Sequence, residues 1–225
     1  MYTLTDLLYK HLYITIAINQ VMRTPKSKTK ENLIYEEDIK KINKILKTPQ
    51  EKLLFKVLLF TGMRISEFLH FKKDWISKDW DYIQIPKEQK CDCKECKRLR
   101  EGIWKPKTAE GVRTIPLLSE IKIILKGYFN NYDTIMEFYP YGRVECWKII
   151  KQLGKKAELK QHLFPHALRG SHATILAQHD FKEFDLTSAM GWKSIQTARD
   201  YIKFSGKQLK KKYDALGKDA FGSEE

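Results

Sequence analysis

Helical spacing of apolar residues runs through most of this chain, and it is clearest in the stretch YEEDIKKINKIL. There Ile39, Ile42 and Ile45 recur at intervals of three, with Leu46 completing one face. Acidic residues fill the first turn, where the helix dipole favours negative charge. The pattern predicts an amphipathic helix that packs one side against a core.

A second helix is predicted to begin directly after Thr48. Thr48 is suited to the N-cap, Pro49 to the first helical position and Glu51 to the third, which together make a strong start signal. The run EKLLFKVLLF that follows is apolar on nearly every side, so we expect it in the middle of the core. Gly62 then allows a turn, from which Arg64 would emerge.

The pattern changes to two-residue alternation between 80 and 117, where DYIQIP and VRTIPL carry β-branched residues and end in proline. This alternation predicts two strands of a small antiparallel sheet. Between them lies a long insertion, KEQKCDCKECKRLREGIWKPKTAEG, with Lys107 near its return. The fold class predicted is therefore mainly α with a small antiparallel β-sheet.

The remaining segments return to helical spacing. Ser119 is predicted to cap a helix over EIKIILKGYF, and a further basic helix is predicted over VECWKIIKQLGKKAEL. The last predicted helix, Lys207–Leu216, presents Leu209, Tyr213 and Leu216 on one apolar face.

Residues 1–32 are predicted to be an N-terminal segment without a domain of its own. Its first part, 1–22, has a mixed period, and Arg23–Asn32 (RTPKSKTKEN) lacks large apolar residues and is rich in lysine. The second part therefore favours a flexible basic linker. The compact domain is predicted over 33–225.

Charge narrows the choice of partner. The chain has 42 Lys+Arg against 28 Asp+Glu, a formal net charge of +14, which favours a polyanion, with nucleic acid ahead of a membrane surface. The first apolar run, Leu12 to Ile18, is too short to span a bilayer, and no targeting signal is evident. We expect a cytoplasmic protein, associated with the nucleoid.

The four cysteines are poorly arranged for a secreted disulfide framework, because three of them crowd into CDCKEC. Cys91, Cys93 and Cys96 could bind zinc through three thiolates, with a fourth ligand from Cys146 or a histidine. The alternative is a set of free thiols on a basic loop facing DNA.

A protein that cuts a phosphodiester without metal needs a nucleophile, cations on the non-bridging oxygens and an acid for the leaving alkoxide. Arginine suits the second task because its planar fork binds oxygens in pairs and stays protonated. Tyr201 is a suitable nucleophile if nearby arginines and a histidine activate its phenol, whose pKa is about 10.

Several motifs in order resemble one family. TGMRISEF, KPKT-x4-R-x-IPL, H-x-x-R followed by SHAT, MGW-x-S and T-x-x-x-Y resemble the tyrosine recombinase (phage integrase) family, over about residues 33 to 216. The Cys-rich insertion looks most like archaeal and archaeal-virus members. The resemblance implies the catalytic-domain fold of that family.

It also implies roles for particular residues. Arg64 and Arg169 would grip the scissile phosphate, and Lys107 would protonate the leaving 5′ oxygen, with Lys105 as the rival lysine. His166 would exchange protons with Tyr201, which would form the 3′-phosphotyrosyl link. Three more assignments complete the set: Glu67 would orient the first arginine, Trp192 would contact the phosphate or pack as a core aromatic, and Tyr213 is the poorer candidate for nucleophile.

Many relatives have histidine at position 192, and an indole can donate a hydrogen bond but cannot shuttle a proton. The other histidines are interpreted as structural or exposed: His11, His70, His162, His172 and His179.

The function implied is a site-specific recombinase that integrates or excises a mobile element or viral genome, with no cofactor needed for its chemistry. Double-stranded DNA attachment sites and a tetramer on DNA would be its partners, with a monomer in solution and no membrane contact. Two alternatives stay open, a type IB topoisomerase-like enzyme and a non-catalytic DNA-binding remnant. Most family members have a separate DNA-clamping domain before the catalytic domain, whereas only some thirty residues precede it in this sequence.

Overall fold

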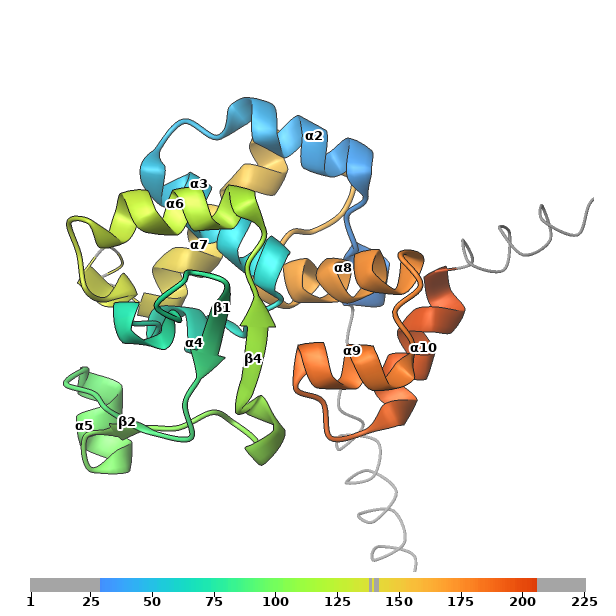
Figure 1. Cartoon of the computed structure of the whole chain (residues 1–225). Helices are drawn as coiled ribbons and strands as arrows, with labels where there is room; N and C mark the ends of the chain where they lie inside the picture. The colour runs from blue at the N-terminus through green and yellow to red at the C-terminus, as the bar shows by residue number, and fades with distance from the viewer. Residues whose placement is uncertain (1–28, 138, 140–141, 206–225) are drawn as a thin grey trace, which may run out of the picture.

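The structure, a computed structural model, describes residues 29–137, 139 and 142–205 (Figure 1). Its described part is mostly helical with two small antiparallel sheets, which confirms the predicted fold class. No helix in those ranges is both long enough and apolar enough to cross a bilayer. The α-helices are α2 (Glu36–Ile45), α3 (Pro49–Thr61), α4 (Ile65–Leu69), α5 (Lys94–Arg100), α6 (Ser119–Phe129), α7 (Gly142–Lys156), α8 (Pro165–Gln178), α9 (Glu183–Met190) and α10 (Ile195–Ser205).

Helix α3 is the centre of the core, as its apolar run predicts. The Thr48 hydroxyl accepts the backbone N–H of Glu51 at 3.1 Å, and the Glu51 carboxylate accepts the Thr48 N–H at 3.1 Å, so the predicted capping box is present. Leu54 and Phe55 are fully buried. The helix ends at Gly62, whose left-handed φ of 60° suits glycine.

The predicted sheet pairs β1 (Tyr82–Ile85) with β4 (Arg113–Pro116) in antiparallel register, with Ile83 opposite Ile115. Inside the insertion, β2 (Gln89–Lys90) pairs with β3 (Ile103–Trp104), and α5 lies between these strands in sequence. The sequence pattern did not predict this second sheet, because its strands are only two residues long and show no alternation.

Two local predictions are wrong. Ser119 is the first residue of α6 and its side chain caps nothing; the N-cap is Leu118. The Leu117 N–H still bonds to the Asp81 carbonyl at 2.8 Å, so the chain passes from sheet pairing to helix without room for a serine cap. The end of the predicted flexible linker is also folded: Asn32 is buried, and its side chain accepts the His162 N–H at 2.7 Å.

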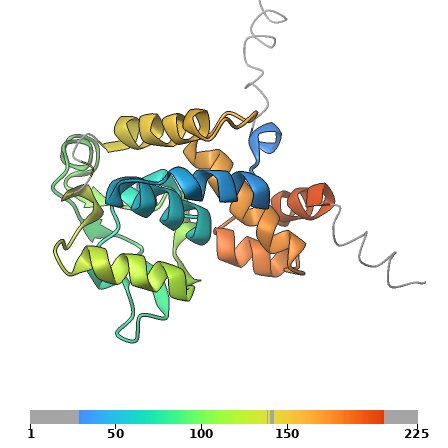
Figure 2. The ribbon, with the colours of Figure 1, turned by 90° about the horizontal axis from the view of Figure 1, so that it is seen from above.

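The three C-terminal helices α8, α9 and α10 pack together at one side of the molecule, and the insertion with α5 lies at the other (Figure 1). Helix α8 packs on α3, and α9 packs on β4, so these two contacts join the C-terminal helices to the core. Figure 2 shows α2 and α6 lying across one face of this core. The predicted segment 1–22, most of the linker and the predicted helix Lys207–Leu216 lie outside the described residues.

Candidate active site

A cavity of about 240 Å³ brings together five of the six residues that the sequence analysis assigned to catalysis. They come from the N-cap of α4, from α8 and α10 and from the loop after α9, which are separate segments of the sequence. The cavity is lined by Thr29, Arg64, His166, Arg169, Gly170, Trp192, Thr197 and Tyr201.

Arg64 is the N-cap of α4, and Glu67, three residues later in the helix, accepts hydrogen bonds from it. The Glu67 carboxylate accepts the Arg64 backbone N–H at 2.8 Å and its Nη1–H at 2.8 Å. Arg64 Nη2 also donates to the Gly191 carbonyl at 2.9 Å. The guanidinium is therefore fixed on both sides by acceptors before any substrate arrives.

Arg113 is a site residue to which the sequence analysis gave no role. Its Nη2 donates to Glu67 at 3.0 Å, and its other contacts are the carbonyls of Ala189 and Gly111 at 3.0 and 3.1 Å. Burial raises the pKa of the Glu67 carboxyl, but the charge and hydrogen bond of Arg113, the charge of Arg169 and the Arg64 backbone N–H together outweigh it, so the pKa is lowered. Glu67 therefore stays ionised between two arginines.

A signal for Arg113 was present in the strand pattern. Arg113, Ile115 and Leu117 are two residues apart, and the last two are buried on one face. An arginine in register with core residues must find a buried acceptor, and Glu67 is that acceptor.

Arg169, on α8, is buried and reaches across to two other elements. Its Nη1 donates to the carbonyl of Gly62 and its Nη2 to the carbonyl of Met190. Burial and then the nearby charges of Arg64 and Arg113 lower the pKa of its guanidinium. The site is therefore short of negative charge, which a bound anion would supply.

Arg64 and Arg169, the two arginines that line the cavity, each have N–H donors that no described residue accepts. A guanidinium has five N–H groups, and the described residues accept two from Arg169 and two from the Arg64 side chain. Three remain on each, enough for a paired contact with phosphate oxygens.

His166 lies one helical turn before Arg169, at the exposed side of the cavity. Desolvation by its surroundings, followed by the charges of Arg169 and Arg64, lowers the pKa of its imidazole. The ring is therefore neutral at pH 7 and has a lone pair available to accept a proton.

Tyr201 is 8% exposed, and its ring stacks on Trp192 with 5.1 Å between centroids. A Cβ at Gly170 would lie 3.2 Å from the Tyr201 hydroxyl oxygen, so the hydroxyl lies against α8 beside Arg169. The expected activation is not present in the protein alone: burial raises the pKa of the phenol by more than Arg169 lowers it. Tyr201 is therefore protonated at neutral pH.

Lys107, the sixth residue assigned to catalysis, is exposed and is not among the residues that line the cavity. Its charge contributes to the lowered pKa of His166. Gly111, in the same loop, would place a Cβ 3.7 Å from Arg64 Nη1, so this loop passes beside the arginine. The rival Lys105 forms an ion pair with Glu88 at 3.6 Å instead.

The cysteines of the insertion gather around His70, one of the histidines interpreted as structural or exposed. The four ligand atoms of His70, Cys91, Cys93 and Cys96 lie within 4.8 Å of one another. Cys146 belongs to α7 and is fully buried away from this group. Among the described residues, no other group of three or more His, Cys, Asp or Glu side chains is arranged to hold a metal ion.

Sequence comparison supplies the family. The profile of the phage integrase family matches residues 32–207. Tyrosine recombinase XerD of Staphylococcus aureus strain Mu50 is 28% identical over 182 residues, which covers 81% of this chain and 58% of that protein. XerD of Staphylococcus haemolyticus is 24% identical over 198 residues, covering 79% and 60%. The chain thus spans somewhat more than half the length of these relatives.

Solved structures show the same fold. XerA recombinase superposes with a TM-score of 0.61 at 18% identity, covering 81% of this chain and 62% of that one. The Tn1549 transposon integrase in complex with transposon right end DNA gives 0.61 at 20% identity, covering 86% and 69%. The catalytic domain of bacteriophage HP1 integrase gives 0.53 at 18% identity, covering 86% and 99%. The chain therefore belongs to the phage integrase family, and its described part has the fold of a tyrosine recombinase catalytic domain.

Proposed function

We propose that this protein is a site-specific DNA recombinase that integrates or excises a mobile element or viral genome, with residues 33–225 as its catalytic domain. It would cleave and rejoin DNA through a 3′-phosphotyrosyl intermediate. The observation that carries the proposal is the cavity in which Arg64, Arg169 and the Tyr201 hydroxyl converge beside a neutral His166.

The chemistry follows from these groups. The Tyr201 oxygen attacks phosphorus while His166 accepts the phenolic proton, and the bond from phosphorus to the 5′ oxygen breaks. Arg64 and Arg169 stabilise charge on the two non-bridging oxygens. Lys107 donates a proton to the departing 5′ oxygen, and the reverse sequence joins a new strand.

Trp192 has two contributions in this scheme. Its ring packs on Tyr201 and so orients the phenol, and its indole N–H can donate to a phosphate oxygen. Because the indole cannot carry a proton, His166 is the base at the nucleophile.

We propose that the chemistry needs neither metal nor ATP. The buried carboxylate at this site, Glu67, is already shared by Arg64 and Arg113, so it is a poor ligand for Mg²⁺. The arginines supply the charge stabilisation that a metal provides in other phosphoryl-transfer sites.

The decisive experiment is incubation with a suicide substrate that carries the candidate attachment site, read on a denaturing gel for a protein–DNA adduct. We expect adduct from the wild type without Mg²⁺ and after brief EDTA treatment, none from Tyr201→Phe, and normal adduct from the matched control Tyr213→Phe. Adduct formation by Tyr201→Phe would overturn the proposed nucleophile.

The two alternatives give different results. Exchange of strands between two labelled duplexes would separate a recombinase from a type IB topoisomerase-like enzyme, which nicks and reseals one duplex. Covalent trapping on nicked DNA would exclude a non-catalytic DNA-binding remnant.

We further propose double-stranded attachment sites and a tetramer on DNA as the partners, with a monomer in solution, in the cytoplasm at the nucleoid. The apolar face Leu209, Tyr213 and Leu216 supports an intersubunit role for the terminal segment. Deleting residues after Gly206 should leave DNA binding intact and stop strand exchange; exchange at the full rate would contradict that role. The Cys-rich insertion supports an affinity with archaeal and archaeal-virus members.

A further inference from the structure

The insertion between β1 and β4 brings three thiols to the imidazole of His70, the C-cap of α4, so that four possible metal ligands lie within 4.8 Å of one another. His70 Nε2 lies 3.6 Å from Cys93 Sγ and 3.5 Å from Cys96 Sγ. A tetrahedral zinc ion, with bonds of about 2.3 Å to sulfur and about 2.0–2.1 Å to nitrogen, sets its sulfur and nitrogen ligands about 3.6 Å apart. These two nitrogen–sulfur separations therefore match those across a zinc ion.

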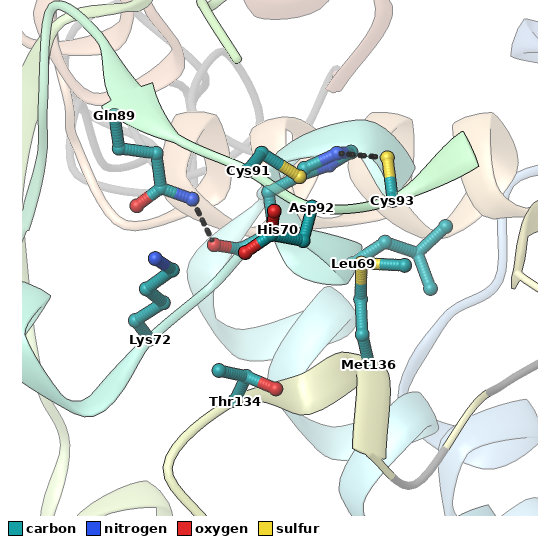
Figure 3. A pocket seen from close by; sticks show the side chains of 9 residues that line it. All are labelled: Leu69, His70, Lys72, Gln89, Cys91, Asp92, Cys93, Thr134 and Met136. Atoms are coloured by element: carbon teal, nitrogen blue, oxygen red, sulfur yellow. Dashed lines mark hydrogen bonds between the residues drawn. The ribbon is translucent and has the colours of Figure 1, made fainter. Parts of the chain in front are cut away.

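The protonation of His70 also suits a metal ligand. Its Nδ1 lies 2.7 Å from the Ser66 carbonyl, which can only accept, so Nδ1 carries the hydrogen. The Nε2 lone pair is then directed at the thiols, and Figure 3 shows the His70 ring pointing to Cys93 with Cys91 beside it. A hydrogen bond from the far ring nitrogen to a carbonyl is usual for zinc-binding histidines.

The surroundings hold the four residues in place. The His70 ring stacks on the buried Trp104 at 5.3 Å, and the Cys96 N–H donates to Cys93 Sγ at 3.3 Å. The Gln89 side chain donates to the His70 carbonyl at 2.8 Å and accepts the Trp75 indole N–H at 2.7 Å. The cluster is thus braced by both strands of the small sheet β2–β3.

We propose that His70, Cys91, Cys93 and Cys96 bind one structural Zn²⁺ ion. Soft thiolates with one imidazole select zinc over Mg²⁺ or Ca²⁺. Four protein ligands complete a tetrahedral shell, so this ion holds structure and does not activate water.

The position of the cluster gives the ion a second effect. Helix α4 has Arg64 at its N-cap and His70 at its C-cap. The three cysteines lie in the segment that leads through β3 to Lys107. The zinc ion therefore joins the helix that positions the first arginine to the insertion that carries the proposed general acid. Metal binding is independent of the proposed function, and only this effect on cleavage rests on it.

The binding experiment uses the full chain purified under reducing conditions, without DNA. We expect about one zinc per chain by elemental analysis, and Co²⁺ exchange should give the visible absorption of tetrahedral cobalt–thiolate. Cys93→Ser should lose most of the metal, and the matched control Cys146→Ser should keep it. His70→Cys should still bind Co²⁺, with stronger thiolate charge-transfer absorption, which tests His70 even if His70→Ala fails to fold.

Several outcomes would overturn the site. Wild-type protein that carries no zinc and gives no tetrahedral Co²⁺ spectrum excludes it, and an unchanged spectrum in His70→Cys excludes His70 as a ligand. Oxidised cysteines in protein purified under reducing conditions would indicate a disulfide instead.

The coupling to catalysis is tested on the same protein after zinc is stripped and restored. We expect cleavage to fall at least fivefold on stripping, with DNA affinity within twofold, and to recover with Zn²⁺. A substrate whose leaving 5′ oxygen is replaced by sulfur needs no general acid. Stripping zinc should therefore lower cleavage of that substrate by a smaller factor. Equal losses on both substrates would contradict an effect through Lys107, whereas zinc binding without any cleavage by the wild type would reject the proposed function alone.

Discussion

The candidate active-site cavity and the Cys/His cluster lie at opposite ends of α4, and they are assembled in different ways. The cavity draws Arg64, Arg169 and Tyr201 from three distant segments and fixes its cations with backbone carbonyls and Glu67. The cluster takes three of its four members from six consecutive positions. The cavity therefore depends on the whole fold, whereas the cluster depends mainly on one insertion.

The largest effect should come from removing a cation of the cavity. Arg169→Ala should lower cleavage by about 10³-fold, because a preorganised donor to transition-state charge contributes about 10²–10³. Non-specific DNA affinity should change less than twofold, since it arises from many surface lysines. Single-turnover cleavage and filter binding measure the two.

Arg199→Ala is the matched control, because Arg199 is an exposed arginine on α10 that pairs with Glu183 at 3.7 Å. Parallel losses of binding and cleavage in Arg169→Ala would mean that Arg169 only positions DNA.

The second-largest effect should distinguish Lys107 from Lys105, the two candidate lysines of the insertion. Lys107→Ala should slow cleavage by about 10²-fold, the lower end of what a general acid contributes. Lys105→Ala should be nearly neutral, because Lys105 pairs with Glu88. A substrate with sulfur in place of the leaving 5′ oxygen should restore cleavage by Lys107→Ala. If cleavage stays slow on that substrate, Lys107 contributes to DNA binding instead.

The third prediction concerns protein stability and the Glu67 carboxylate, which pairs with both Arg64 and Arg113. Glu67→Gln leaves these arginines without a buried anion, so it should destabilise the protein by about 3 kcal/mol and lower Tm by roughly 10 °C. Thermal unfolding measures this loss. Glu37→Gln, at an exposed ion pair with Lys40, is the control and should change Tm little.

Lowering the pH should weaken the same ion pairs between Glu67 and the arginines. The pKa of Glu67 is lowered in the folded protein, so its stabilisation is present above the unfolded pKa and is lost as pH falls through the folded value. Wild type and Glu67→Gln should therefore converge in stability at acid pH, and a constant difference down to pH 3 would contradict this.

The smallest effect concerns pH and activity. Because the pKa of His166 is lowered from 6.5, its neutral form already predominates at pH 7. Cleavage at sub-saturating DNA should therefore rise with pH below about 6.5 and change less than twofold between pH 7 and 8. A rise continuing through pH 8 would point to another base.

Local signals in the sequence determined much of this protein. The capping box at Thr48, the apolar run of α3 and the alternation in β1 and β4 each specify structure through neighbours a few residues apart. Spaced motifs likewise predicted Arg64, His166, Arg169 and Tyr201 as site residues, because a family resemblance needs only their order, and the four line one cavity. The cysteine spacing showed three candidate ligands for the same reason.

Only the tertiary structure decided which of these side chains contact one another. Arg113 reaches Glu67 across 46 positions, and His70 joins the cysteines from more than twenty residues away. The phenol of Tyr201 has a raised pKa because burial against α8 outweighs the charge of Arg169, a balance that no local pattern contains. Hydrogen bonds, desolvation and metal geometry depend on distances in space, and those distances exist only once α3, α4, α8 and β4 have packed together.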